Sequence, residues 1–319
     1  MTPASAGPTP VMIWLAYAAA FLGVCGHASS EFVVKLTGLG GPEVSVWRFM
    51  IGGAALLLVA LITPSARDLL TPLRRDFWPI VSLSIFGMTA GQFLFHWALD
   101  YASVVEVATL VTTMPILVVF VAKLVDGTAI GPAKLISGTG AFLGCVFLLS
   151  DGFAAEVSGA GGNLTGLLMA IGCAVIGAVY LVLIKPYTQR YGAIRMTTYT
   201  FVLGFFVLWP MVGWLWEIWV NPLDLFARPG DNAAAIVALG VWNTCIGFIL
   251  WLWGLANVPD VGRGNYLFFL KPVIAALLAY AILGDTITWP QILAVAAITG
   301  FVAAEILYGE RRRLSAGGN

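Results

Sequence analysis

A lysine in the middle of a long apolar stretch is the first feature of this sequence that points to chemistry. Lys271 lies within residues 265–284, NYLFFLKPVIAALLAYAILG, directly before Pro272. A cation at bilayer depth costs about 2.5–3.5 kcal/mol on insertion scales, and such residues usually face a partner or a water-filled cavity. We therefore expect Lys271 to bind an anionic group such as a carboxylate. In the alternative, it pairs with a backbone carbonyl that Pro272 leaves without a donor, and only supports the helix.

Amide and aromatic side chains fall at the same expected depth. At 1.5 Å per residue, Lys271 lies roughly 15 Å into its segment, and Asn243 reaches about the same depth in the preceding one. Trp242 is next to Asn243, and Trp251 follows two turns later on a related face. This combination suits a ligand that carries a carboxylate and an aromatic group, and the tryptophan rings would also contact its ammonium.

A second set of polar side chains lies nearer the predicted outer face of the membrane. His27 and Glu31 follow each other at i, i+4 on the first apolar segment. Gln92 and His96 do the same on the third, and Tyr101 lies just before the fourth. We interpret these residues as a polar vestibule on the exit path, with Glu31 available for an amine. The alternative is ordinary anchoring of helix ends at the membrane interface.

The acidic residues avoid the predicted midplane of the membrane. Proton-coupled carriers commonly use a midplane carboxylate, so a simple carboxylate relay is not expected. We favour a facilitator that runs down the gradient of its substrate; in the alternative, His27, His96 or Lys271 carries the proton. The sequence has no Ser/His pair, paired Asp or HExxH helix for hydrolysis, so no enzyme activity is expected.

The composition is that of a membrane protein. Of 319 residues, 60% are hydrophobic and 10% charged, with a mean hydropathy of +0.94, whereas soluble domains carry about 25% charged residues. Sixteen basic and sixteen acidic residues give zero net charge, and no basic patch indicates binding to nucleic acid. The cysteines stand alone in apolar runs, which favours packing over a disulfide or metal site, so no cofactor is expected: Cys25, Cys145, Cys173 and Cys245.

Ten apolar segments are long enough to span a bilayer as helices. Glycine- and proline-rich joints separate them. Lys and Arg residues number twelve in the loops on one side and two on the other, which places both termini in the cytoplasm. The predicted spans are residues 11–34, 43–63, 77–98, 103–123, 131–150, 164–184, 196–216, 233–255, 261–283 and 288–308.

The third and fourth segments repeat in the eighth and ninth. Trp97 aligns with Trp253, and Pro115 and Pro272 are each followed twelve residues later by a glycine. Because each half has five segments, the second half must enter the membrane from the opposite side. The halves then form an inverted repeat, an architecture of many secondary transporters. Pro115 and Pro272 would be the hinges at which segments four and nine bend; a static kink is the alternative.

The expected fold is an all-α polytopic membrane protein with ten transmembrane helices in a 5+5 inverted-topology repeat. Residues 11–150 hold the first five segments and residues 164–308 the second five. A glycine-rich linker, residues 151–163, joins them, and residues 1–10 and 309–319 are terminal tails.

This arrangement resembles the EamA type of the drug/metabolite transporter superfamily. Local matches are Pro42 with Arg48-Phe49 in the second segment and Gly284-Asp285 after the ninth. The resemblance implies that segments three, four, eight and nine frame a central cavity, that one, two, six and seven surround it, and that five and ten lie outside. Among members of the superfamily, the chain looks most like bacterial exporters of aromatic amino acids.

We therefore expect a transporter of the bacterial inner membrane that exports small amphipathic metabolites, aromatic and other neutral amino acids first, by alternating access. One alternative is an exporter of drug-like or other metabolites of the proton-coupled multidrug type, which Lys271 disfavours because a cationic cargo would need a carboxylate there. A receptor or scaffold is the other, which the inverted repeat disfavours. The expected partners are a small-molecule substrate and the lipid bilayer, without nucleic acid, and a monomer is favoured.

Overall fold

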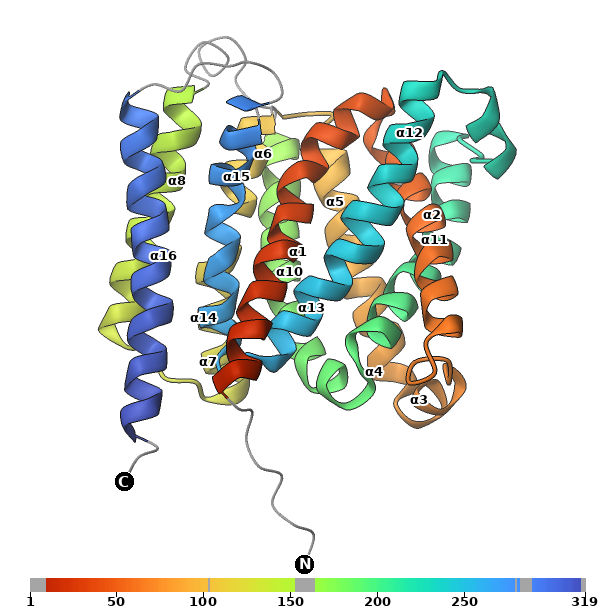
Figure 1. Cartoon of the computed structure of the whole chain (residues 1–319). Coiled ribbons are helices and arrows are strands. Elements are labelled where there is room, and N and C mark those ends of the chain that lie inside the picture. The colour runs from red at the N-terminus through yellow and green to blue at the C-terminus, as the bar shows by residue number, and fades with distance from the viewer. Residues whose placement is uncertain (1–9, 103, 153–163, 279, 282–288, 317–319) are drawn as a thin grey trace, which may run out of the picture.

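The structure is a computed structural model that describes residues 10–102, 104–152, 164–278, 280–281 and 289–316. Every regular element in these ranges is a helix, and the helices stand side by side in one bundle (Figure 1). Within the described ranges, nine helical segments are long and apolar enough to cross a membrane, and residues Pro132–Leu148 form a shorter apolar helix. These ten cover the ten predicted spans, so the prediction of an all-α polytopic membrane protein is confirmed.

The first half of the chain builds its five segments from several shorter elements. Segments one, two and five are single helices, whereas three and four are each divided. The elements are α1 (Pro10–Thr37), α2 (Gly41–Ile62), α3 (Leu70–Arg75), α4 (Phe77–Ser82), η1 (Leu83–Thr89), α5 (Ala90–Ala98), α6 (Val104–Val111), α7 (Met114–Asp126) and α8 (Pro132–Gly152).

The second half is divided in the same way. Segments six, seven and ten are single helices, and eight and nine are composite. The elements are α10 (Leu164–Tyr191), α11 (Ala193–Trp216), η2 (Pro222–Ala227), α12 (Gly230–Ala238), η3 (Leu239–Ile246), α13 (Gly247–Asn257), α14 (Val261–Asn265), η4 (Tyr266–Leu270), α15 (Lys271–Leu278) and α16 (Trp289–Ala316).

Two π-helices lie at corresponding places in the two halves. The element η1 begins at Leu83 in segment three, and η3 begins at Leu239 in segment eight. Their spacing, 239 − 83 = 156, equals the spacing between Trp97 and Trp253, 253 − 97 = 156. Short π-helical stretches inside α-helices occur frequently at functional sites. The sequence repeat therefore extends to a local backbone distortion that the apolar pattern does not predict.

The two prolines of the repeat each begin a new helical segment. Helix α6 ends at Val111 and α7 begins at Met114, with Pro115 in its first turn. In segment nine, a 3₁₀ turn (η4) separates α14 from α15, which begins at Lys271 directly before Pro272. Proline lacks the N–H that an uninterrupted helix requires, but the first turn of a helix does not use that donor. Segments four and nine therefore change from one helical element to the next at the two prolines of the repeat, and the hinge role of these prolines stays a prediction.

Helices of the two halves pair across the bundle. Helix α1 packs along α13, α10 along α5, α2 along α11 and α8 along α16. The first two pairs correspond to each other, because each joins the first helix of one half to the third segment of the other. Helices α8 and α16 stand together at one edge of the bundle (Figure 1), the position that the family resemblance implies for segments five and ten.

Buried ion pairs tie the edge helices to the start of segment nine. The Lys134 ammonium of α8 pairs with Asp260, and Arg263 Nε of α14 donates to Glu305 Oε1 of α16 at 3.1 Å. Burial acts to raise the pKa of the Asp260 carboxyl, but the hydrogen bond and charge of Lys134 outweigh it, so this pKa lies below its ordinary value. These contacts lie on the face where α1 begins and α16 ends, the lower face in Figure 1.

Glycines allow α1 and α13 to approach closely. A Cβ on Gly254 would lie 2.5 Å from the backbone N of Ala20 and 2.6 Å from the carbonyl O of Ala16. Membrane helices have little hydrophobic drive to associate, so small residues that permit backbone contact carry much of the packing. On the same helix pair, a Cβ on Gly23 would lie 2.6 Å from Trp251 Cβ. Trp251 is therefore fixed against α1.

We predict opposite effects for two alanine substitutions of helical glycines. Gly254→Ala places a methyl group against the α1 backbone and should destabilise the protein by about 1–3 kcal/mol, as overpacking usually does. Gly300→Ala in α16 is the matched control, because its Cβ would meet nothing within 4 Å. It should be neutral or stabilise by up to about 1 kcal/mol, since alanine is the better helix former. Thermal unfolding of the purified variants measures both; equal melting temperatures would contradict the packing described here.

Candidate functional site

A small cavity lies between helices of both halves. Its volume is about 40 Å³. A water molecule needs roughly 10–15 Å³ of such volume, so the cavity has room for a few waters but not for an amino acid. The elements α1, α2, η1, α5, α6, α7, α10, α13, η4 and α15 contribute its lining, which consists of His27, Ser30, Arg48, Gly87, Met88, Gly91, Gln92, Phe95, Val111, Met114, Cys173, Gly177, Trp251, Phe268 and Lys271.

Residues that correspond in the sequence repeat face this cavity together. Phe95 corresponds to Trp251, because 251 − 95 = 156, and both line the cavity. Met114 precedes Pro115 as Lys271 precedes Pro272, and these two also line it. This arrangement is expected of a site between two related halves. The repeat places a methionine where the second half has a cation.

Arg48 is the most constrained charged group of the cavity. Its side chain is 1% exposed. Its Nε donates to Thr244 Oγ1 of η3 at 3.0 Å, and its Nη1 donates to Ser30 Oγ of α1 at 3.3 Å. The guanidinium also lies 5.7 Å from the centroid of the Phe248 ring of α13. One side chain of α2 thus contacts the first segment and two of the three elements of the eighth, η3 and α13.

A chain of hydrogen bonds with fixed directions continues from Arg48 into α5. Nη1 of Arg48 is 3.1 Å from Nε2 of His96, and since arginine only donates, Nε2 must accept. Nδ1 of His96 therefore carries the hydrogen and donates to Ser45 Oγ at 2.7 Å. Ser45 in turn donates to the carbonyl O of Gly41 at 2.8 Å. The expectation of no Ser/His pair is therefore wrong as to contact, although in this pair the histidine donates and the serine accepts. His96 is held as one neutral tautomer, because a second proton on Nε2 would face the Arg48 guanidinium.

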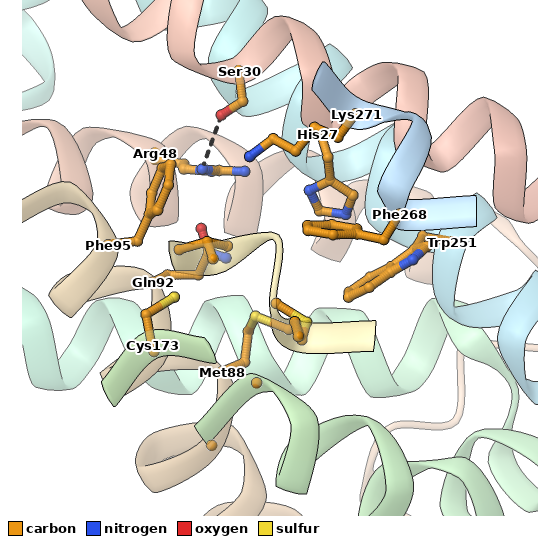
Figure 2. Close-up of a pocket in the computed structure, with 15 residues that line it drawn as sticks. His27, Ser30, Arg48, Met88, Gln92, Phe95, Cys173, Trp251, Phe268 and Lys271 are labelled. Carbon is orange, nitrogen blue, oxygen red and sulfur yellow. Dashed lines mark hydrogen bonds between the residues drawn. The ribbon is translucent and has the colours of Figure 1, made fainter. Parts of the chain in front are cut away.

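The Lys271 ammonium lies against aromatic side chains of the cavity wall. Its Nζ lies 5.1 Å from the ring centroid of Phe95 and 5.5 Å from that of Phe268, distances at which a cation is attracted to a ring face. The His27 ring packs edge-on against Trp251, with centroids 4.6 Å apart. Figure 2 shows Lys271 extending toward Arg48 above these rings. The cavity therefore has cations on one side and an aromatic wall beside them.

Two buried polar atoms on the glutamine and histidine side chains of the lining have no hydrogen-bond partner among the described residues. They are Oε1 of Gln92 and Nε2 of His27. Buried polar groups are nearly always satisfied by protein, water or ligand. An acceptor oxygen and a ring nitrogen that face a cavity are suited to the polar groups of a small molecule.

The structure brings four of the predicted site residues together. Lys271, Trp251, Gln92 and His27 line the cavity, although they come from segments nine, eight, three and one. Trp242 and Asn243 lie elsewhere. Asn243 is fully buried and its Nδ2 donates to the Gly26 carbonyl O at 2.6 Å, which ties η3 to α1.

The other predicted residues have different positions. The Trp242 side chain is 38% exposed, donates to Ser29 Oγ at 3.1 Å and borders a separate open groove beside η2 and α12. His96 does not line the cavity but holds Arg48. Tyr101 is 41% exposed in the turn after α5, where it contacts Trp97. The side chain of Glu31 lies outside the described residues.

Arg48 is the charged cavity residue that the sequence-based site did not include. Its place about one turn into an apolar segment put it near the predicted outer face, where a charge is easily explained by the interface. The signal that pointed to it was the local match of Arg48-Phe49 to the superfamily pattern. Phe95 and Phe268 gave no signal, because phenylalanine is ordinary in an apolar span.

The comparison with known families establishes what class of protein this is. A profile of the EamA-like transporter family matches residues 9–150 and 164–304. The chain belongs to this family and is a multi-pass membrane transporter.

Individual relatives are distant but cover most of the chain. A protein of Streptantibioticus cattleyicolor named as a probable terminal-alkyne amino-acid exporter is 25% identical, with 79% of each chain covered. The uncharacterized transporter YyaM of Bacillus subtilis is 24% identical over 82% of this chain and 83% of its own, and an uncharacterized transporter of Archaeoglobus fulgidus is 28% identical over 76% and 80%. A crystal structure that covers 93% of this chain and 98% of its own superposes with a TM-score of 0.77 at 25% identity.

The hydrogen-bond chain from Arg48 predicts different costs for two buried serines. Ser45→Ala removes the acceptor of His96 Nδ1 and should destabilise the protein by about 1–3 kcal/mol, the usual penalty for leaving a buried donor unsatisfied. Ser84→Ala is the matched control, because Ser84 is as buried but its Oγ has no partner among the described residues. It should be close to neutral in thermal unfolding. Equal losses for both variants would show that His96 does not depend on Ser45.

Proposed function

We propose that this protein exports small amphipathic metabolites that carry a carboxylate, aromatic and other neutral amino acids first. The observation that carries the proposal is the cavity in which Lys271 stands beside the rings of Phe95, Phe268 and Trp251. A lysine suits the carboxylate, and the rings supply apolar area. The name of the Streptantibioticus relative points toward amino acids, as does the sequence resemblance to aromatic amino-acid exporters.

Transport would proceed by alternating access around this cavity. The cavity is too small for an amino acid, so its walls must move apart to admit one. The interruptions at Pro115 and Pro272 and the paired π-helices η1 and η3 are the places where the segments around it depart from regular α-helix. We propose Pro115 and Pro272 as the hinges. The two halves, residues 11–150 and 164–308, would rock as an inverted repeat with both termini in the cytoplasm.

The energy source we propose is the substrate gradient itself. The described lining of the cavity includes no Asp or Glu that would carry a proton. His96 accepts a hydrogen bond from Arg48 and is not available as a base in this arrangement. The two basic residues also disfavour the alternative of a proton-coupled exporter of cationic drugs, because like charges would meet in the cavity.

The test of this function is uptake into proteoliposomes. Labelled tryptophan, labelled threonine and a cationic dye are offered with and without a pH gradient to the wild type, Lys271→Ala and Lys123→Ala. We expect amino-acid uptake without a pH gradient, and a loss of about tenfold or more in Lys271→Ala, since a charged hydrogen bond contributes about 1.5–3 kcal/mol. Lys123→Ala removes an exposed lysine of the fourth segment and should leave uptake unchanged.

Two results would contradict the proposal. Movement of the dye alone would exclude carboxylate-bearing cargo. Normal amino-acid uptake by Lys271→Ala would separate the transport activity from this cavity, and only the family membership would stand.

A further inference from the structure

The two basic residues of the cavity belong to different halves of the chain. Arg48 is on α2 and Lys271 is on α15, yet both face the same small volume (Figure 2). Both side chains are nearly buried, with 1% and 6% exposed. Like charges that face one low-dielectric cavity repel each other, and an anion placed between them is attracted to both. The geometry therefore favours an anionic group at one particular place.

The two cations differ in how firmly they are held. Arg48 is fixed by hydrogen bonds to Thr244, Ser30 and His96, which come from three other segments. A guanidinium fixed in this way presents planar donors that match a carboxylate. Lys271 stands at the first residue of α15, after the 3₁₀ turn of an interrupted segment. Its ammonium is a point charge on a long stem, so it can follow a movement of segment nine.

We propose that one carboxylate of the cargo bridges Arg48 of the first half and Lys271 of the second, and that Arg48 is thereby a specificity-determining residue. This inference rests on the proposed function and defines its chemistry. A carboxylate that contacts both halves is bound best when the halves are closed around it. An amide at the same position offers only one uncharged acceptor oxygen, and a protonated amine offers no acceptor and is repelled by both cations. The cavity should therefore select for the free acid.

Ligand-dependent thermal stabilisation of the purified full-length protein tests this without requiring transport. Each acid is compared with its amide: tryptophan with tryptophanamide, and leucine with leucinamide. 3-Indolepropionate and tryptamine show separately what the carboxylate and the amine contribute. We expect tryptophan and 3-indolepropionate to stabilise at concentrations about ten- to hundredfold lower than the amide and tryptamine do, the range that a charged hydrogen bond accounts for.

Variants then assign the selectivity to the two cations. Arg48→Lys keeps the charge but loses the planar donors, and Lys271→Met loses the charge with little change in volume. Each should reduce the preference for acid over amide by about tenfold or more. Thr244→Val removes one contact of Arg48, the one at Nε, together with the Thr244 hydrogen bond to the Leu239 carbonyl O, and should reduce the preference less. Lys123→Met is the control for removal of a lysine and should keep the full preference. Melting temperatures without ligand show whether each variant is folded.

The results separate this inference from the proposed function. If labelled tryptophan is transported but neither tryptophan nor leucine stabilises the protein better than its amide, the carboxylate site is wrong and the exporter stands. The same holds if folded Arg48→Lys and Lys271→Met retain the full acid preference. If only leucine exceeds its amide, the carboxylate site stands and aromatic cargo is excluded. If no acid in the panel exceeds its amide, the inference is overturned.

Discussion

The burial of a permanently charged guanidinium inside an apolar bundle is the constraint on which the site depends. Arginine cannot lose its proton in a protein, so Arg48 must be surrounded by acceptors or leave the interior. Its described partners are Thr244, Ser30 and His96, each from a different segment. The hydrogen bonds between Arg48 and these three partners fix the tautomer of His96, the rotation of η3 and the position of α1 relative to α2. Much of the polar chemistry around the cavity therefore follows from one residue.

The sequence repeat explains where the cavity lies, and the exceptions to the repeat carry its proposed chemistry. Phe95 and Trp251 face the cavity as corresponding residues, which is expected of a site between related halves. Met114 and Lys271 are also corresponding residues, but one is apolar and the other a cation. The two halves thus share a backbone plan, including paired π-helices and paired helix starts at proline, while the charges break the symmetry. The proposed transport uses both, because related halves would allow two access states and an asymmetric site would orient the cargo.

The sequence was sufficient for the membrane segments, because length and hydropathy decide which stretches can span a bilayer. It also identified Lys271, Trp251, Gln92 and His27, which share the cavity. Depth along a segment does not fix the direction of a side chain around the helix, and η3 changes that direction further because a π-helix has a different number of residues per turn. For this reason the Trp242 side chain is partly exposed at the surface and the Asn243 side chain contacts α1, instead of the cavity that their sequence positions predicted. The hydrogen bonds that hold Arg48 join side chains from four different segments, so no local sequence pattern predicts them.

The most direct measurement is an experimental structure of the protein with 5-bromotryptophan, in which anomalous scattering locates the bromine. The account predicts a carboxylate within hydrogen-bond distance, about 3 Å, of both Arg48 and Lys271, with the bromoindole against Trp251 and Phe268 in a widened cavity. Bromine in the open groove beside Trp242, or a ligand whose carboxylate points away from both cations, would contradict it.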